Sequence, residues 1–184
     1  MRKMYKNKFG NHILFSNLEF YSRIQRVKSL MIKKKIDILL VSSPANQFYL
    51  TGYDGWSFYT PQMVLISLNE KDPYWIGRQM DSVGARFTSF LDKKHIIPYP
   101  DTYVASNTKH PMNFLVNFIK KKKWHNKNIG VEMDDYYYTA RWHQILKTNL
   151  SDAKFKDAFL LVNWARMVKS KQELIDMRQA GQIA

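Results

Sequence analysis

The residues that could do chemistry gather in one short segment, positions 50–62, which reads LTGYDGWSFYTPQ and lies between two apolar runs. It holds four aromatic side chains and two glycines. Glycine permits positive φ or a close approach of another chain, and Tyr and Trp offer flat apolar faces with a hydrogen-bonding edge. The composition predicts either a contact surface for a small polar ligand or a partner, or an aromatic mini-core that fixes the loop, since large aromatics are usually buried.

Other residue types that catalyse reactions or bind metals are not arranged for either task. The five histidines are scattered, and no two have the i, i+4 spacing of a helical metal site. Asp134 and Asp135 are neighbours, a pattern more typical of a turn or a helix cap than of a shared site. The chain has no cysteine and no glycine-rich phosphate loop. We therefore predict no catalytic residue, no metal ligand and no cofactor in this chain.

Composition and charge narrow the class of protein. With 184 residues, 45% hydrophobic and 24% charged, the chain can form one globular domain, or one domain and part of another. Its net charge of +14 is compatible with a nucleic-acid partner. The lysine runs at 33–35 and 120–123, however, fall where helices should end, and helix dipoles favour cations there, so these runs do not require such a partner. No apolar window approaches the roughly 18 residues that cross a bilayer, and no secretory signal is present. We predict a cytoplasmic protein that binds neither nucleic acid nor membranes.

The elements that must position these residues alternate between helices and strands. A capping-box spacing at Ser16 and Glu19 predicts an amphipathic helix that ends near Lys34. Strands are predicted at 36–41, 62–68, 73–77, 94–99, 128–133 and 153–156, and helices at 46–50, 80–90, 111–123, 138–146 and 158–167. Three basic residues are expected on the solvent side of the first helix: Arg23, Arg26 and Lys28. The alternation predicts an α/β fold with helices on the faces of a sheet.

The last segment has a second capping-box spacing, at Ser170 and Glu173, followed by apolar residues at helical intervals up to the end of the chain. A helix whose apolar face has no following element favours a truncated chain. The alternative is a terminal helix that docks onto its own domain.

Several short motifs follow one another in a fixed order. SPAN stands at 43–46, YLTGY at 49–53, IGVE at 129–132 and VKSKQEL at 168–174. This order resembles the amino-terminal domain of the creatinase, prolidase and aminopeptidase P superfamily. Within that superfamily, TGYDGWSFY at 51–59 and HPM at 110–112 resemble the ectoine hydrolases.

The resemblance implies a mixed-sheet α/β domain with a ribonuclease H-like topology over residues 16–168. A basic extension would precede it at 1–15, and residues 169–184 would begin a carboxy-terminal catalytic domain of pita-bread fold. The chain would then be a substrate-lid and dimerisation domain of an enzyme that hydrolyses a non-peptide C–N bond in ectoine degradation, inactive alone and completed in a homodimer. Two alternatives stay open: a free-standing binding module, or the amino-terminal domain of an Xaa-Pro peptidase.

The same resemblance implies which side chains would face the substrate. Ectoine is a cyclic amidine with a carboxylate, so recognition needs an aromatic face for the cation and a donor or cation for the carboxylate. The alternative for Arg78 is a surface ion pair with Asp81, and the alternative for His110 is a cap on the helix that starts at Pro111. The expected substrate-binding residues are Tyr53, Trp56, Phe58, Tyr59, Gln62, Arg78 and His110.

Overall fold

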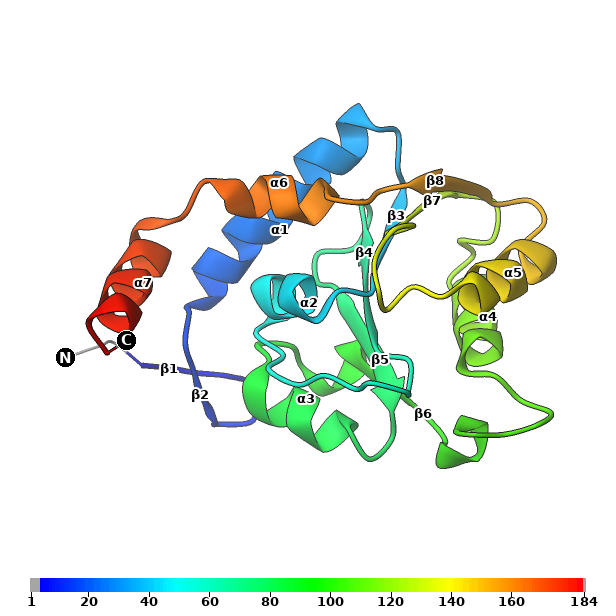
Figure 1. Ribbon diagram of the computed structural model, residues 1–184, viewed down its shortest axis with the longest axis horizontal. Helices are drawn as coiled ribbons and strands as arrows, with labels where there is room; N and C mark the ends of the chain where they lie inside the picture. The colour runs from blue at the N-terminus through cyan, green and yellow to red at the C-terminus, as the bar shows by residue number, and fades with distance from the viewer. Residues whose placement is uncertain (1–3, 184) are drawn as a thin grey trace.

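A six-stranded mixed sheet forms the centre of the computed structural model, which describes residues 4–183 (Figure 1). The strand order is β6-β5-β4-β3-β7-β8. β3 and β5 both run antiparallel to β4, and the other neighbouring pairs are parallel. The bounds are β3 (Ile38–Val41), β4 (Met63–Ser67), β5 (Tyr74–Arg78), β6 (Ile96–Tyr99), β7 (Asn128–Val131) and β8 (Lys154–Asp157). The predicted α/β fold with a mixed sheet is confirmed.

Helices cover both faces of this sheet (Figure 1). On one face lie α1 (Asn17–Lys33), α2 (Pro44–Thr51), α3 (Ser82–Thr88) and α6 (Leu161–Met167), and on the other lie α4 (Pro111–Lys121) and α5 (Ala140–Asn149). Two short 3-10 helices, Lys93–His95 and Asp101–Tyr103, flank β6. Every residue of β3 and β4 is buried, as expected for strands covered on both faces. The apolar side chains accordingly form two core clusters, one on each face.

The solvent side of α1 differs from the prediction. Ser16 caps the helix, because its Oγ accepts from the Glu19 N–H at 3.1 Å. Arg23, however, is only 1% exposed and stacks on the Phe15 ring at 3.9 Å. Its guanidinium contacts Glu19 at 3.0 Å and Glu173 at 3.2 Å. Lys28 is also buried and donates to the backbone carbonyl of Glu70. The prediction of a wet face was wrong for both residues, because later segments of the chain cover that side of the helix.

The amino-terminal segment is more than a basic extension. β1 (Tyr5–Lys6) and β2 (His12–Ile13) form a small antiparallel hairpin. Between them, the side-chain amide of Asn7 donates to the backbone carbonyls of Arg86, Phe87 and Ser89 at the end of α3, at 2.8, 3.2 and 2.9 Å. Ile13 continues into the first core cluster. The described part of this segment therefore belongs to the domain, while residues 1–3 lie outside the described residues.

Helix α7 (Lys171–Ile183) lies at the end of the described chain, beside α1 and β1 (Figure 1). Its capping box is confirmed in both directions: Ser170 Oγ accepts from the Glu173 N–H at 3.2 Å, and the Glu173 carboxylate accepts from the Ser170 N–H at 2.7 Å. None of its described residues is buried. An ion pair of Glu173 with Arg23 links it to the body of the domain.

Candidate functional site

The aromatic segment is a loop between α2 and β4 that divides into a buried part and an exposed part. Gly52 ends α2 in the left-handed conformation, with φ 78°. Tyr53 then turns inward: it is 3% exposed and its ring lies 5.1 Å from that of Trp75. A Cβ on Gly55 would come within 2.6 Å of the Tyr53 hydroxyl, so this glycine lets the loop pass directly over the ring. Burial raises the pKa of Tyr53.

The other aromatics of the loop point outward. Trp56, Phe58 and Tyr59 are 59%, 66% and 75% exposed. A local turn presents two of them, because the Thr60 N–H donates to Ser57 Oγ at 3.1 Å and closes the chain around positions 58 and 59. Tyr53 therefore belongs to a mini-core, as one of the two sequence alternatives had it. The other three rings are exposed, and their contact with a ligand or a partner stays a prediction.

A second loop, residues 132–139, completes this surface. The ring of Tyr137 lies 6.4 Å from Trp56, and the ring of Tyr136 lies 6.2 Å from Phe58. Tyr136 is 73% exposed. We call these five side chains the aromatic site: Trp56, Phe58, Tyr59, Tyr136 and Tyr137. Sequence reasoning missed the last two; the signal was a run of three tyrosines at 136–138, which begins four positions after the end of the IGVE motif.

The cavity between the two loops is small. Its volume is about 80 Å³, and Phe58, Tyr59, Tyr136 and Tyr137 are among the residues that line it. Small-molecule pockets usually measure about 300–1,000 Å³ and surround most of the ligand. The cavity between these two loops is therefore too small to enclose a small-molecule ligand by itself.

The remaining expected residues are already engaged within the domain. Gln62 is buried, and its amide donates to Asp81 at 2.7 Å. Arg78 pairs with Asp101 at 2.8 Å, not with Asp81 as the sequence alternative had it, since the 3-10 turn after β6 brings Asp101 to the end of β5. That ion pair raises the pKa of Arg78.

His110 caps α4 through Nδ1, which accepts from the Met112 N–H at 3.1 Å. This is the capping role that the sequence offered as an alternative to substrate binding. Burial, with a smaller contribution from Arg141, lowers the pKa of His110. Arg78, like His110, is absent from the lining of the small cavity, so the structure gathers the aromatic residues but not the two cation candidates.

Beneath the aromatic site lies a buried carboxylate, Glu132, which is 1% exposed at the end of β7. Its Oε2 accepts from the backbone N–H groups of Ser42 and Ser43 at 2.7 and 3.0 Å, and its Oε1 accepts from the Asn46 amide at 2.7 Å. Burial raises the pKa of Glu132, while these hydrogen bonds oppose the rise. The carboxylate thereby joins β3, the start of α2 and the loop that carries Tyr136.

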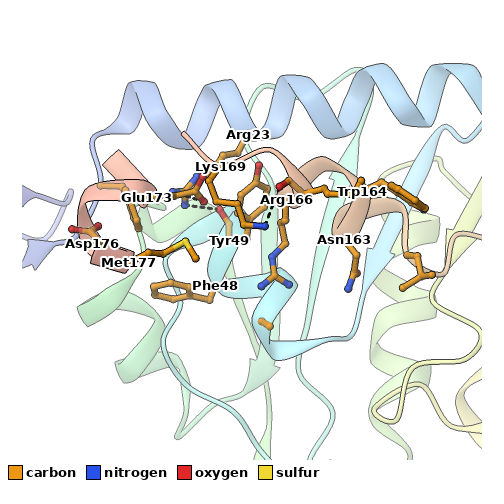
Figure 2. A pocket seen from close by; sticks show the side chains of 14 residues that line it. Arg23, Phe48, Tyr49, Asn163, Trp164, Arg166, Lys169, Glu173, Asp176 and Met177 are labelled. Carbon is orange, nitrogen blue, oxygen red and sulfur yellow. Dashed lines mark hydrogen bonds and ion pairs between the residues drawn. The ribbon is translucent and has the colours of Figure 1, made fainter. Parts of the chain in front are cut away.

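A larger cavity of about 670 Å³ lies elsewhere, between α1, α2, α6 and α7. Figure 2 shows Glu173 and Met177 on its α7 side and Trp164 and Arg166 on its α6 side, with Phe48 below. Its charged groups are largely paired within the chain: Arg166 donates to Asn46 at 2.7 Å, and Glu173 pairs with Arg23. None of the seven residues expected from the sequence lines it.

Within residues 4–183 no three His, Asp or Glu side chains come together as metal ligands. No helix among the same residues is both long and apolar enough to cross a membrane. The expectation that the chain holds neither metal nor cofactor stays a prediction.

With this geometry in view, comparison with known families identifies the class of the domain. Residues 23–168 match the model of the creatinase/prolidase N-terminal domain. The chain belongs to this family.

Two curated relatives match over nearly the whole chain. An uncharacterized hydrolase/peptidase, y4tM, of Sinorhizobium fredii is 47% identical over 92% of this chain and 43% of its own length. The ectoine hydrolase of Halomonas elongata is 45% identical over 92% of this chain and 42% of its own length. The chain therefore spans less than half the length of these relatives.

Solved structures share the fold at low sequence identity. A dipeptidase from Pyrococcus horikoshii matches with a TM-score of 0.67 and 18% identity, over 88% of this chain and 41% of its own. The N-terminal domain of a cytoplasmic peptidase from Mycobacterium tuberculosis matches with a TM-score of 0.59 and 16% identity, over 79% of this chain and 98% of its own. These structures share the fold of the domain, and the family match assigns the chain to the creatinase/prolidase N-terminal domains.

Proposed function

We propose that this domain forms the substrate-facing wall and the dimer contact of an ectoine hydrolase-like enzyme, which hydrolyses a non-peptide C–N bond in the cytoplasm. The catalytic groups would belong to the carboxy-terminal half that its longer relatives carry. The 45% identity to an ectoine hydrolase supports this substrate class. On this proposal the domain alone hydrolyses nothing.

The observation that carries the proposal is the aromatic site. Its members are mostly exposed, yet they come from two loops that are far apart in the sequence and meet ring against ring. Monomeric proteins seldom expose such patches without a use. A delocalised amidinium cation is attracted to aromatic faces, by about 0.5–2 kcal/mol per ring depending on desolvation.

The test is a hybrid enzyme. Residues 4–168 of this chain, which include the amino-terminal hairpin, replace the aligned part of the Halomonas elongata ectoine hydrolase, and ectoine hydrolysis is measured. We expect the hybrid to be active. A folded hybrid that hydrolyses other substrates of the class but not ectoine would refute the substrate assignment.

Two matched variants of the hybrid test the site itself. Phe58 and Phe87 are 66% and 59% exposed, but Phe87 lies on α3, outside the aromatic site. Phe58→Ala should lower kcat/KM by about tenfold, as expected for the loss of one cation–π contact of about 1.4 kcal/mol. Phe87→Ala should leave it unchanged. Equal effects of the two variants would remove the aromatic site from the mechanism.

A further inference from the structure

A chain of hydrogen bonds runs through the interior from α6 to the loop that carries Tyr136. Arg166 of α6 donates from Nη1 to Asn46 Oδ1 at 2.7 Å, and Asn46 Nδ2 donates to Glu132 Oε1 at 2.7 Å. Asn46 Nδ2 also donates to Asn163 Oδ1 at 3.0 Å, a second partner on α6. Figure 2 shows the side chains of Arg166 and Asn163 extending from α6 toward α2. We call the three residues Arg166, Asn46 and Glu132 the relay.

The two ends of the relay allow only one orientation of the amide between them. A guanidinium has donors only, and an ionised carboxylate has acceptors only. Glu132 accepts N–H groups at both of its oxygens, which favours the ionised form. If the Asn46 amide turned by 180°, its oxygen would face Glu132 Oε1 and its nitrogen would face Arg166 Nη1. Both hydrogen bonds would then become repulsive contacts, so Arg166 fixes the direction in which the amide presents its donor to Glu132.

Arg166 also supplies the positive charge of this network. Glu132 is buried, and a buried ion without a compensating charge is strongly destabilising. The elements β3, β4, β7 and α2 carry no Lys, Arg or His, and Arg166 is the single such residue of α6. The Asn46 amide, polarised between the two charged groups, transmits the stabilisation from one to the other.

The carboxylate end of the relay holds the floor of the aromatic site. Glu132 Oε2 accepts from the N–H groups of Ser42 and Ser43, and Ser42 lines the small cavity between the two loops. The Gln47 side-chain amide donates to the carbonyls of Ser42 and Gln62 at 2.8 and 3.2 Å. Gln62 ends the aromatic segment, and Glu132 begins the second loop. One hydrogen-bonded floor therefore joins both halves of the aromatic site.

We propose that Arg166 is a positioning residue of the aromatic site: through Asn46 it orients the Glu132 carboxylate, and this carboxylate fixes the floor on which the two aromatic loops meet. Only residues 168–170 separate α6 from α7, so the relay also joins the aromatic site to the part of the chain that follows the family match. The effect of Arg166 on substrate binding rests on the proposed function, whereas the relay itself does not.

The first experiment follows two NMR signals of the chain, the backbone amide of Ser43, which reports on the carboxylate, and the indole N–H of Trp56, which reports on the aromatic site. Arg166→Met removes the donors and should shift both signals. Arg166→Lys keeps the charge and one donor, and it should shift both signals by a smaller amount. Lys169→Met is the matched control, because Lys169 lines the same large cavity but donates to a backbone carbonyl of its own segment. It should leave both signals unchanged.

A double-mutant cycle tests the route through the amide. Glu132→Gln keeps an oxygen for the backbone N–H groups but turns an amide donor toward Asn46 Nδ2, and Arg166 prevents Asn46 from turning away. Once Arg166 is removed, Asn46 can turn and this conflict ends. In urea unfolding, the double variant Arg166→Met with Glu132→Gln should therefore lose less stability than the two single variants together. Independent roles of the two residues would give additive losses.

The proposal is overturned if Arg166→Met leaves either signal in place, if Lys169→Met shifts the signals equally, or if the losses in the cycle add. The NMR test stays decisive where Glu132→Gln does not fold. Where Arg166→Met does not fold, Arg166→Lys decides, because its single donor should already displace the Ser43 amide signal.

The hybrid enzyme separates this result from the proposed function. In the hybrid, Arg166→Met should raise KM for ectoine and leave kcat unchanged, and Arg166→Lys should restore most of the KM. An unchanged KM, together with the expected NMR shifts in the chain itself, would refute the role of the aromatic site in substrate binding and leave the relay standing.

Discussion

Replacing Tyr53 and Trp56 by alanine, one at a time, should separate the two halves of the aromatic loop. Tyr53 is 3% exposed, and truncating a buried aromatic ring to alanine costs about 3–5 kcal/mol. Trp56 is 59% exposed, so only about two-fifths of its side-chain surface of roughly 200 Å² is buried in the folded protein and can be lost on truncation. At about 25 cal/mol per Å² the loss is at most about 2 kcal/mol, and relaxation of the loop reduces it.

The assay is urea unfolding followed by far-ultraviolet circular dichroism, because the substitutions alter tryptophan fluorescence directly. The free energy of unfolding should fall strongly for Tyr53→Ala and little for Trp56→Ala, with unchanged denaturant dependence in both. A Trp56→Ala variant as unstable as Tyr53→Ala would mean that this ring is part of the core. The aromatic site would then lose its central member.

Three further substitutions have definite expected outcomes. Gly52→Ala should cost more stability than Gly10→Ala. Both glycines have positive φ (78° and 83°), but only at Gly52 would an added Cβ meet other atoms, the nearest at 2.9 Å. Equal losses of stability in urea unfolding would exclude the packing contribution at Gly52. Arg23→Ala should cost about 2–4 kcal/mol, since it removes a buried guanidinium and leaves two half-buried carboxylates, Glu19 and Glu173, unpaired, and a loss below about 1 kcal/mol would show that the pairs are open in solution. His110→Ala should remove a pH-dependent part of the stability, because the lowered pKa of His110 keeps the ring neutral as an acceptor for the Met112 N–H. This contribution is present above about pH 6.5 and is lost as the pH falls through the lowered pKa. An identical pH profile of stability in the variant would contradict the capping role.

Much of the fold was predictable because local patterns determine it. The continuous apolar run at 36–41 became the fully buried strand β3, and the Pro111 signal opened α4 at that residue. The prediction for Arg23 was wrong because its partner Glu173 lies far along the chain, where no periodicity can reveal it. The strand predicted at 94–99 begins with a 3-10 turn, where His95 bonds to the Asp92 side chain at 2.7 Å.

The candidate site was predictable only in part, because contacts between segments distant in the sequence complete it. The glycine and aromatic composition of the loop marked it as a surface, but the sequence did not separate Tyr53, which is buried, from Trp56, which is not. Tyr136 and Tyr137 join it through contacts between distant segments. The Arg78 partner was likewise misplaced, because register between parallel strands β5 and β6, not sequence proximity, brings Asp101 near.

The hairpin at the amino-terminal end also has a consequence for the order in which the chain folds. Asn7 bonds to carbonyls about 80 residues later, so its contacts close a long loop, and such closure is slow and entropically costly until the intervening sheet exists. During synthesis Ile13 and Phe15 leave the ribosome long before residues 86–89. These early apolar residues therefore stay exposed to solvent until their partners are synthesised, and the hairpin segment docks among the last parts of the domain.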